Sequence, residues 1–428
     1  MNEKVLVVGI DAGRFTHEWA LVEEGGKVVW RKGVANVMVF LRSALKQVET
    51  RALGTVLVFA MEMDYGNSGA LVRLLLEAGH EVRLCAPLRV KRYRESLGLG
   101  NKNDKKDAGV IARFCLERRE RLPKAHRPRS GRQALRILSR QLDRVSRQRT
   151  RQGNYLRGLL VEYYPDLVSA RLLGVLPSPT ALAFLRRYSA LSRAKGASVT
   201  QLTEVLRQAS RGKIGKERAQ QIKEHLKDYD LPAVVEQAYA EVVRSLVKTL
   251  ELLLAEEERL LTLAERVAVG DHHYQKLLEV PGIASRLGVK ILGEMGDPQA
   301  YGKEEKWAAH AGYVPVERQS GEGRGLRFLP QACNKRLREA IFQSCVASLK
   351  SSPASRAYYD RKVQEAPPKS QPSGKGRKYK PAVRALLALG RHRCRLIWKL
   401  LTTEERYDES KLGQNGRNEE AQSLAQAA

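Results

Sequence analysis

Residues 5–13 read VLVVGIDAG, an apolar strand followed at once by an acid and then by a glycine. Asp11 therefore stands at the tip of a strand that is apolar enough to be buried. A second apolar run, VLVFAM at residues 56–61, ends in the same way on Glu62. Burying a carboxylate at a strand end costs free energy unless its charge is compensated. The two strand ends therefore predict a site at which acids share a cation.

Two further acids lie in the segment NDKKDA at residues 103–108. Asp104 and Asp107 are three residues apart, a spacing that places both side chains on one face of a helix. Together with Asp11 and Glu62 they would complete a four-carboxylate site. Carboxylate oxygens are the ligands that Mg²⁺ prefers, with Mn²⁺ as an alternative. Such a site predicts metal-assisted phosphoryl transfer, in which two ions about 3.5–4 Å apart activate a nucleophile and stabilise the leaving oxygen.

The chain has 428 residues and a formal net charge of +29, from 76 Lys and Arg against 47 Asp and Glu. This length allows two or three domains with their own cores. The charge indicates a polyanionic partner, with a merely solvated basic surface as the alternative. No apolar segment reaches the roughly 20 residues that cross a bilayer, and no secretory signal precedes the first strand. Five widely spaced cysteines form no metal or disulfide pattern, which favours a reducing cytoplasm.

The order of the expected elements predicts an α/β domain followed by α-helical regions. Strands are expected over residues 4–10, 18–24 and 27–31, a helix over 37–48, a strand ending at residue 62, a helix over 68–78 and a strand over 81–85. Three strands followed by alternating helix and strand indicate a mixed sheet with helices on its faces. Acids on the first strand, the fourth strand and a late helix are the order that a ribonuclease-H-like (Holliday-resolvase-like) fold requires.

Two long helices are expected in the middle of the chain. In the first, residues 131–160, arginines recur at steps of three and four and form a ridge suited to phosphate contacts, with a simply exposed basic helix as the alternative. These arginines are Arg132, Arg136, Arg140, Arg144, Arg147 and Arg151. The second helix, residues 233–268, carries a heptad seam interrupted by Glu257, which predicts a coiled coil. We favour a dimer interface over an intramolecular hairpin with the arginine helix.

The last third of the chain is predicted to be mainly helical. Residues 280–297 read as helix, glycine turn and helix, which is either a hairpin whose amides hold a nucleic-acid phosphate or an ordinary turn. The predicted domains are residues 1–118 for the Holliday-resolvase-like domain that carries the four acids, 119–270 for the basic helix and coiled coil, 271–408 for a C-terminal helical domain, and 409–428 for a disordered tail.

Ser320 is a candidate nucleophile in the glycine-rich segment between residues 313 and 330. A serine between glycines is usually only a turn residue, but Arg318, Arg324 and Arg327 lie close by in the sequence. Their guanidinium groups could stabilise a pentavalent phosphate. A hydroxyl becomes a useful nucleophile only when it is positioned and activated. No histidine partner is evident nearby, so a metal held by the acids would have to serve.

Several of these motifs occur together, and in the same order, in a known family. The N-terminal ones are GIDAG at residues 9–13, Thr16-His17, Met61-Glu62, Ala86-Pro87 and KNDKKDA at residues 102–108. The C-terminal ones are PGI at residues 281–283, EMGD at 294–297, AGYVP at 311–315, QSG at 319–321, Asn334 with Leu337-Arg338, and YYD at 358–360. The chain resembles the DEDD, Holliday-resolvase-like transposases of the one-hundred-ten family of bacterial insertion sequences, related to the pilin-gene invertase Piv.

The resemblance implies an RNA-guided, site-specific DNA recombinase. In it Asp11, Glu62, Asp104 and Asp107 would hold Mg²⁺, and Ser320 would attack DNA and form a covalent phosphoserine link. The two halves of a composite active site would come from different subunits of a homo-oligomer, a dimer to tetramer. A structured bridge RNA would pair with donor and target DNA in the bacterial cytoplasm. The sequence departs from the family at residues 63–65 and at Cys333, where a glycine is usual.

Two other functions are compatible with the same residues. A metal-dependent Holliday-junction resolvase-type nuclease would use the acids and water, without a covalent intermediate and without RNA. A non-catalytic nucleic-acid-binding protein would carry the acids as surface charge only. Protein–DNA adducts favour the recombinase, free DNA ends favour the nuclease, and indifference to EDTA favours the binding protein.

Overall fold

The computed structural model of the chain describes residues 4–62, 65–99, 104–126, 130–318, 326–365 and 381–409. Its contacts divide the chain into two compact units, Met1–Pro128 and Arg129–Ala428. The first unit ends later than the predicted boundary at residue 118. Within the described residues, no helix combines the length and the apolar character needed to span a membrane. Residues 366–380 and all of the predicted tail except residue 409 lie outside the described residues.

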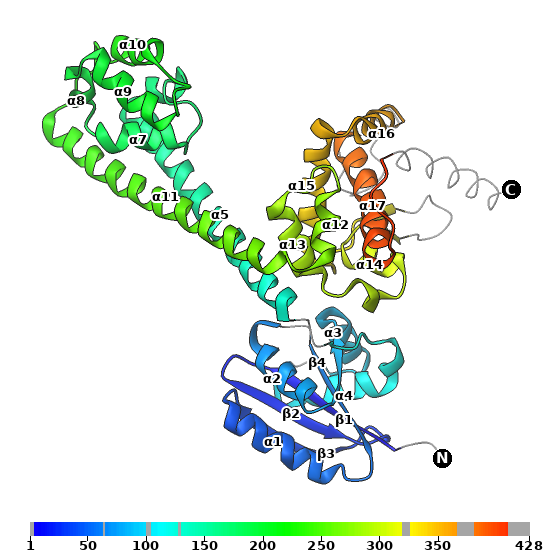
Figure 1. The fold of residues 1–428 in the computed structure, drawn as a ribbon. Helices are drawn as coiled ribbons and strands as arrows, with labels where there is room; N and C mark the ends of the chain where they lie inside the picture. Colours follow the sequence, from blue (N-terminus) through cyan, green and yellow to red (C-terminus); the bar gives the residue numbers. More distant parts are fainter. Residues whose placement is uncertain are drawn as a thin grey trace. The chain divides into compact units, whose positions relative to one another are not determined.

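The first unit is built on a five-stranded mixed sheet (Figure 1). Its strands are β1 (Val5–Ala12), β2 (Thr16–Val22), β3 (Val28–Ala35), β4 (Val56–Glu62) and β5 (Glu81–Cys85). They lie in the order β3-β2-β1-β4-β5, with β1, β2 and β3 antiparallel and β4 and β5 parallel to β1. This is the ribonuclease-H-like arrangement that the order of elements predicted, and the prediction is confirmed.

Helices cover both faces of this sheet. On one face Val8, Ile10 and Phe59 pack with residues of α1 (Met38–Arg51) and α2 (Tyr65–Glu77). On the other face Val7, Val58 and Ala60 pack with residues of α3 (Pro87–Ser96) and α4 (Asp104–Arg118). A single turn, η1 (Arg119–Arg121), follows α4. Because side chains alternate between the faces of a strand, every second residue of β1 and β4 faces α4.

Gly9 allows α4 to lie directly on β1. A Cβ atom at this position would stand 2.0 Å from the carbonyl oxygen of Ala108 and 2.5 Å from the amide nitrogen of Ala112. Any larger residue would push the helix away from the sheet. The glycine of the opening motif therefore allows the first turns of α4 to lie against β1, the strand that carries Asp11.

The second unit begins with two long helices that run side by side, α5 (Ser130–Tyr163) and α11 (Ala233–Ala268) (Figure 1). The seam predicted on α11 is buried in the single chain, where Val243, Leu246 and Leu250 share a core with Leu156 and Leu160 of α5. The preferred dimer interface is therefore wrong for these residues, and the intramolecular hairpin is the correct alternative. Their apolar side chains are already covered by the chain's own helix.

Glu257, which interrupts the seam, bridges three helices. Its side chain is 10% exposed, and its carboxylate oxygens lie 2.7 Å from Nε of Arg149 on α5 and 2.6 Å from Nη2 of Arg286. Arg286 belongs to α13 (Ser285–Met295). The acid therefore joins α11 to both neighbours, and burial of its charge is offset by two guanidinium groups.

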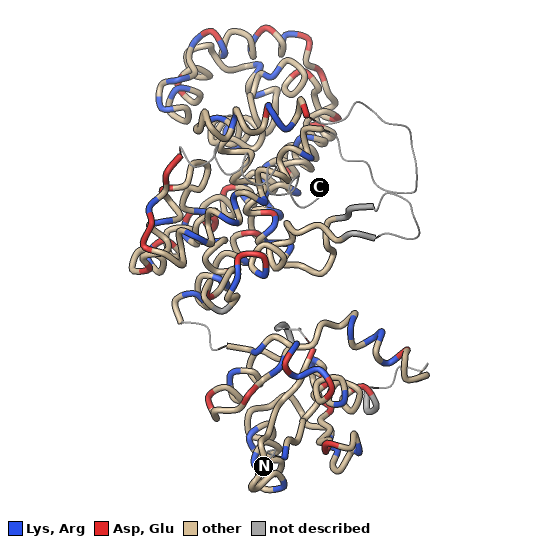
Figure 2. Tube along the Cα trace, turned by 90° about the vertical axis from the view of Figure 1, so that its right-hand side faces the viewer, with Lys and Arg blue, Asp and Glu red and all other residues tan. Residues whose placement is uncertain are grey.

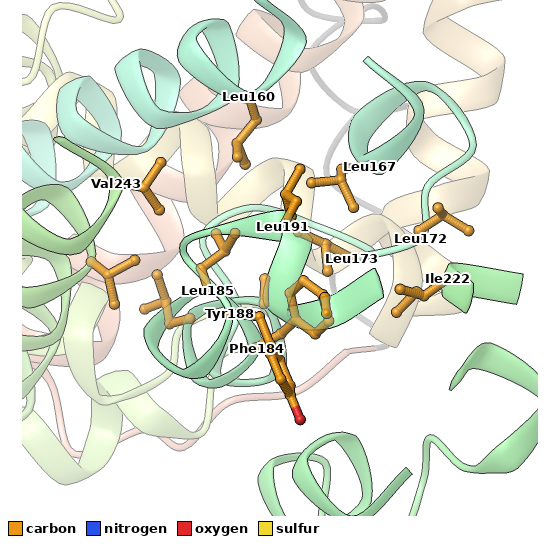
Figure 3. Packing of buried hydrophobic residues seen from close by; sticks show 14 of the residues in the cluster. Leu160, Leu167, Leu172, Leu173, Phe184, Leu185, Tyr188, Leu191, Ile222 and Val243 are labelled. Atoms are coloured by element: carbon orange, nitrogen blue, oxygen red, sulfur yellow. The ribbon is translucent and has the colours of Figure 1, made fainter. Parts of the chain in front are cut away.

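A small helical module fills the chain between the two long helices. It comprises α6 (Asp166–Ser169), α7 (Pro179–Arg187), α8 (Leu191–Gly196), α9 (Val199–Ala209) and α10 (Lys216–His225). Figure 3 shows its core, in which Phe184, Leu185 and Ile222 meet Leu160 of α5 and Val243 of α11. The weak periodicity of residues 177–227 did not predict this module, because its short helices are stabilised by packing rather than by a long amphipathic stripe.

The rest of the second unit is a helical bundle with one short hairpin. Its elements are α12 (His272–Leu278), α13, η2 (Pro298–Tyr301), α14 (Glu304–His310), β6 (Val316–Arg318), β7 (Leu326–Phe328), α15 (Lys335–Ser351), α16 (Pro353–Gln364) and α17 (Pro381–Thr402). The core of this bundle also includes Leu135 of α5 and Ala264 of α11. Trp307, fully buried, donates from Nε1 to the carbonyl oxygen of Cys394 at 2.8 Å and so joins α14 to α17.

Candidate carboxylate site

Asp11 and Glu62 lie at the same end of the sheet, on adjacent parallel strands. Ile10 pairs with Met61, so the two acids occupy the next position on each strand. Asp11 is in step with Val7 and Gly9, and Glu62 is in step with Val58 and Ala60, so both acids face α4. Both are partly exposed. The prediction that these two strand-end acids meet is therefore supported by the strand register.

The third acid approaches from α4. Asp107 immediately precedes Ala108, the residue in contact with Gly9, and is 8% exposed. Nη1 of Arg94, on α3, lies 3.0 Å from both carboxylate oxygens of Asp107. Asp104 begins α4 one turn earlier, and its side chain lies outside the described side chains. Helix α4 thus brings Asp107 to the face of the sheet on which Asp11 and Glu62 lie.

Cys85, at the end of β5, lies beside Glu62, and its pKa is affected by the charge of this acid. It pairs with Glu62 in the strand register. Burial raises the pKa of the Cys85 thiol well above its usual value, and the neighbouring Cys115 and Glu62 raise it further. The thiol is therefore protonated at neutral pH, and it offers no thiolate for catalysis.

The chemistry of the donor set fits a hard divalent cation. Carboxylates on two strand ends and one helix supply the oxygen ligands that Mg²⁺ requires. Among the described side chains, only Asp271, His272 and His273 bring three possible ligand atoms within 4.8 Å of one another. The carboxylate oxygens of Asp11, Glu62 and Asp107 therefore lie farther apart than the ligands of a single bound ion. Asp107 is paired with Arg94 instead.

The side chains of Asp271 and His273 stabilise the fold through hydrogen bonds to distant segments of the chain. Arg132 donates from Nε to Asp271 at 3.1 Å and also contacts Nδ1 of His273, while Nε2 of His273 lies 2.9 Å from the carbonyl oxygen of Leu401. A guanidinium group between the two ligands opposes a second cation. The carboxylates at the end of the sheet are thus the better candidate for a metal site.

The predicted serine site falls largely outside the described residues. Ser320 and Arg324 belong to residues 319–325, and the side chains of Arg318 and Arg327 are not described either. The strands on either side, β6 and β7, pair with Val316 opposite Phe328 and Arg318 opposite Leu326. The role of Ser320 and the three arginines therefore stays a prediction.

A buried acid lies where the chain enters and leaves this hairpin. Glu294 of α13 has a side chain only 1% exposed, and Arg140 pairs with it through two hydrogen bonds of 2.6 and 3.0 Å. Asn334, which caps α15, donates from its side-chain amide to the same carboxylate at 3.0 Å. The backbone amide of Asn334 donates to the carbonyl oxygen of His310. Burial alone would raise the pKa of Glu294, but the hydrogen bonds from Arg140 and Asn334 hold it below its usual value.

The predicted arginine ridge divides into two parts. Arg132 is 3% exposed and pairs with Asp271, Arg136 donates to the carbonyl oxygen of Gly293, and Arg140 pairs with Glu294. These three join α5 to the bundle, and the burial of Arg132 excludes the phosphate contact predicted for it in this conformation. Sequence spacing could not show which arginines have acids or carbonyl groups from distant segments beside them.

The other half of the ridge faces solvent. Arg147 and Arg151 are exposed and, with Ser146, Thr150 and Asn154, line a surface pocket of about 410 Å³. Arg144 precedes them on the same helix and is exposed as well. Figure 2 shows Lys and Arg in both described units, so no single segment accounts for the net charge of +29. Phosphate binding stays a prediction for Arg144, Arg147 and Arg151.

The glycine turn between α12 and α13 is an ordinary packed turn. Gly282 has φ +83°, and a Cβ there would stand 2.3 Å from the carbonyl oxygen of Ser344. Arg393, 3% exposed, donates to the carbonyl oxygen of Pro281. Because the turn packs against α15, the predicted use of its amides for a nucleic-acid phosphate is not supported by the structure.

The order of the sheet and the position of the acids define a ribonuclease-H-like protein with an acidic centre at the carboxyl ends of its first and fourth strands. Two family models match the chain. The DEDD-type model described as "Transposase" matches residues 8–165, and the model described as "Transposase IS116/IS110/IS902 family" matches residues 274–360. The chain belongs to this family of insertion-sequence transposases, which makes it an enzyme that cleaves or recombines DNA.

Relatives from several bacteria align with nearly the whole chain. An uncharacterised 42 kDa protein of insertion element IS900 from Mycobacterium paratuberculosis is 27% identical over 92% of this chain and 94% of its own length. The transposase for insertion sequence element IS1111A from Coxiella burnetii is 23% identical over 94% of this chain and 91% of its own. Among solved structures, Thermus thermophilus RuvC in complex with a Holliday junction substrate matches with 18% identity and a TM-score of 0.23, over 28% of this chain and 99% of that one.

Proposed function

We propose that this transposase cleaves and rejoins DNA strands at a site that Asp11, Glu62, Asp104 and Asp107 build around Mg²⁺, with Mn²⁺ as a substitute. The observation that carries the proposal is the position of Asp11 and Glu62 at the ends of adjacent parallel strands, on the face that α4 covers. Asp107 reaches the same face because Gly9 admits α4. Bound ions would act there as Lewis acids on a DNA phosphate.

Ser320 is our proposed nucleophile. Its hydroxyl would lose its proton as the oxygen forms a bond to phosphorus, while the bond from phosphorus to the oxygen of the leaving DNA strand breaks and that oxygen takes up a proton. The phosphodiester energy is kept in the serine–phosphate link, so the reverse step with another strand end rejoins DNA without ATP. Arg318, Arg324 and Arg327 would stabilise the charge that develops on the phosphate.

The partners follow from the family resemblance and are proposals as well. The acidic site and the serine would meet across subunits of a dimer or tetramer. A structured guide RNA would pair with donor and target DNA and so supply the sequence specificity, while exposed arginines such as Arg147 and Arg151 would contact phosphates of either nucleic acid.

The proposal predicts that two variants fail in different ways. Ser320→Ala should abolish covalent protein–DNA adducts, and Asp11→Asn should abolish strand cleavage, while both variants keep their affinity for nucleic acid. Adducts are measured on denaturing gels with end-labelled DNA and the co-expressed guide RNA. Ser351→Ala, which removes the hydroxyl of an exposed serine at the end of α15, is the matched control and should behave as wild type.

The outcomes separate the possible functions. Adducts that persist in Ser320→Ala would refute its role as the nucleophile. Cleavage to free ends, without any adduct and without RNA, would identify a metal-dependent Holliday-junction resolvase-type nuclease. Normal cleavage by Asp11→Asn, or in EDTA, would refute the metal site.

A further inference from the structure

Arg94 occupies the carboxylate that the metal site needs from α4. Its Nη1 atom lies 3.0 Å from Oδ1 and 3.0 Å from Oδ2 of Asp107. The two side chains are 17% and 11% exposed, so little water screens the pair. Arg94 is on α3, which packs against α4, and the contact therefore joins two helices on the same face of the sheet.

A metal ion at this site and the guanidinium group of Arg94 would compete for the same carboxylate oxygens of Asp107. A carboxylate oxygen that ligates Mg²⁺ lies about 2.0–2.1 Å from the ion. Such an ion would stand close to the positive charge of Arg94, in a place shielded from solvent, where like charges repel strongly. The three described acids of the site, Asp11, Glu62 and Asp107, are also not drawn together to ligand spacing while this pair is formed.

We propose that Arg94 is a positioning residue that competes with the divalent ion for Asp107. It holds the carboxylate while no ion is bound, and it must release the carboxylate when the ion binds. The proposal depends on the role of Asp107 as a metal ligand given above. Guanidinium groups also match the geometry of phosphate oxygens, so Arg94 can form an ion pair with a DNA phosphate once it has released Asp107. The site would then bind its ions more tightly when DNA is present.

The test measures Mn²⁺ binding to the full-length protein by electron paramagnetic resonance, without DNA. Arg94→Ala should bind Mn²⁺ about tenfold more tightly than wild type, because the competing charge is gone. Arg92→Ala removes an exposed arginine from the same helix and should leave the affinity unchanged. Circular dichroism and thermal melting establish that each variant is folded. Addition of duplex DNA should tighten Mn²⁺ binding in wild type more than in Arg94→Ala.

Two further variants separate this proposal from the metal site itself. The gain in Arg94→Ala should vanish when it is combined with Asp107→Asn, and Asp11→Asn should lower Mn²⁺ binding in every background. If Asp11→Asn lowers the affinity but Arg94→Ala leaves it unchanged or weakens it, the competition is refuted and the metal site stands. If wild type and Asp11→Asn bind Mn²⁺ equally, both proposals are refuted.

Discussion

Glu81, the first residue of β5, shows how one carboxylate can organise its surroundings. Its oxygens lie 2.6 Å from Nε of Arg83, 2.9 Å from Nε of Arg119 and 3.4 Å from Nζ of Lys124. Hydrogen bonding to Arg119, and then to Arg83, lowers the pKa of Glu81 to about 2, although its partial burial opposes the shift. The acid therefore holds the strand to the turn that follows α4.

This shift predicts a loss of stability in acid. A group whose pKa is lower in the folded state contributes stability above its unfolded pKa of 4.5, and the contribution is lost as the pH falls towards about 2. Wild type should therefore lose free energy of unfolding over this range, and Glu81→Gln should lose less because it has no carboxylate to protonate. Urea unfolding of both proteins between pH 5 and pH 2 provides the measurement. Parallel curves for the two proteins would contradict the assignment.

Residues also differ in how far the sequence alone could predict their roles. Asp11 and Glu62 could be predicted because each ends an apolar run, and the end of a strand is visible in sequence. The partner of Asp107 could not, because Arg94 meets it only after α3 and α4 pack together. Glu294 carries a usable signal, an acid inside the apolar helix LGVKILGEM, which indicates a charge that some distant group must satisfy.

At the scale of elements, the long helices show what periodicity can and cannot predict. The heptad spacing of α11 correctly indicated an apolar stripe, but spacing does not say which helix covers the stripe. Similarly, the arginine steps on α5 indicated one ridge, whereas Arg132 and Arg140 turn out to face acids at the start of α12 and in α13. Which surface covers each helix face depends on contacts between segments more than a hundred residues apart in the sequence.

The bridge made by Glu257 leads to a prediction about α11. Glu257→Gln leaves the guanidinium groups of Arg149 and Arg286 without their counter-charge, so the free energy of unfolding should fall by about 2 kcal/mol. The neighbouring Glu256 pairs with Arg259, three residues further along the same helix, on its exposed side. Glu256→Gln is therefore the matched control and should be indistinguishable from wild type in chemical denaturation. Equal loss in both variants would show that the bridge contributes nothing specific.

At the scale of the whole molecule, charge and burial together decide which basic residues can meet nucleic acid. The net charge of +29 predicts binding that weakens steeply with salt. Because Arg132, Arg136 and Arg140 are used inside the second unit, the exposed half of α5 should carry the contacts of this helix.

The double variant Arg147→Ala/Arg151→Ala tests this division. Each lost phosphate contact should reduce the slope of log affinity against log salt by about 0.9 for duplex DNA, so the double variant should reduce it by nearly twice that amount. Arg187→Ala, an exposed arginine at the end of α7, removes charge elsewhere and should leave the slope unchanged. Fluorescence anisotropy across a salt series gives both slopes, and an unchanged slope in the double variant would remove α5 from the nucleic-acid surface.

The module from α6 to α10 is inserted in the sequence between α5 and α11, two helices that pack against each other along their length. The chain leaves at the end of α5 and returns at the start of α11, where Tyr163 and Tyr239 stack with ring centroids 4.7 Å apart. The points of departure and return are thus neighbours, so a tight connector can replace everything between them without rerouting the polypeptide. A shortened enzyme made in this way would be a natural starting point for miniaturisation, and whichever step it lost would reveal what the excised part contributes.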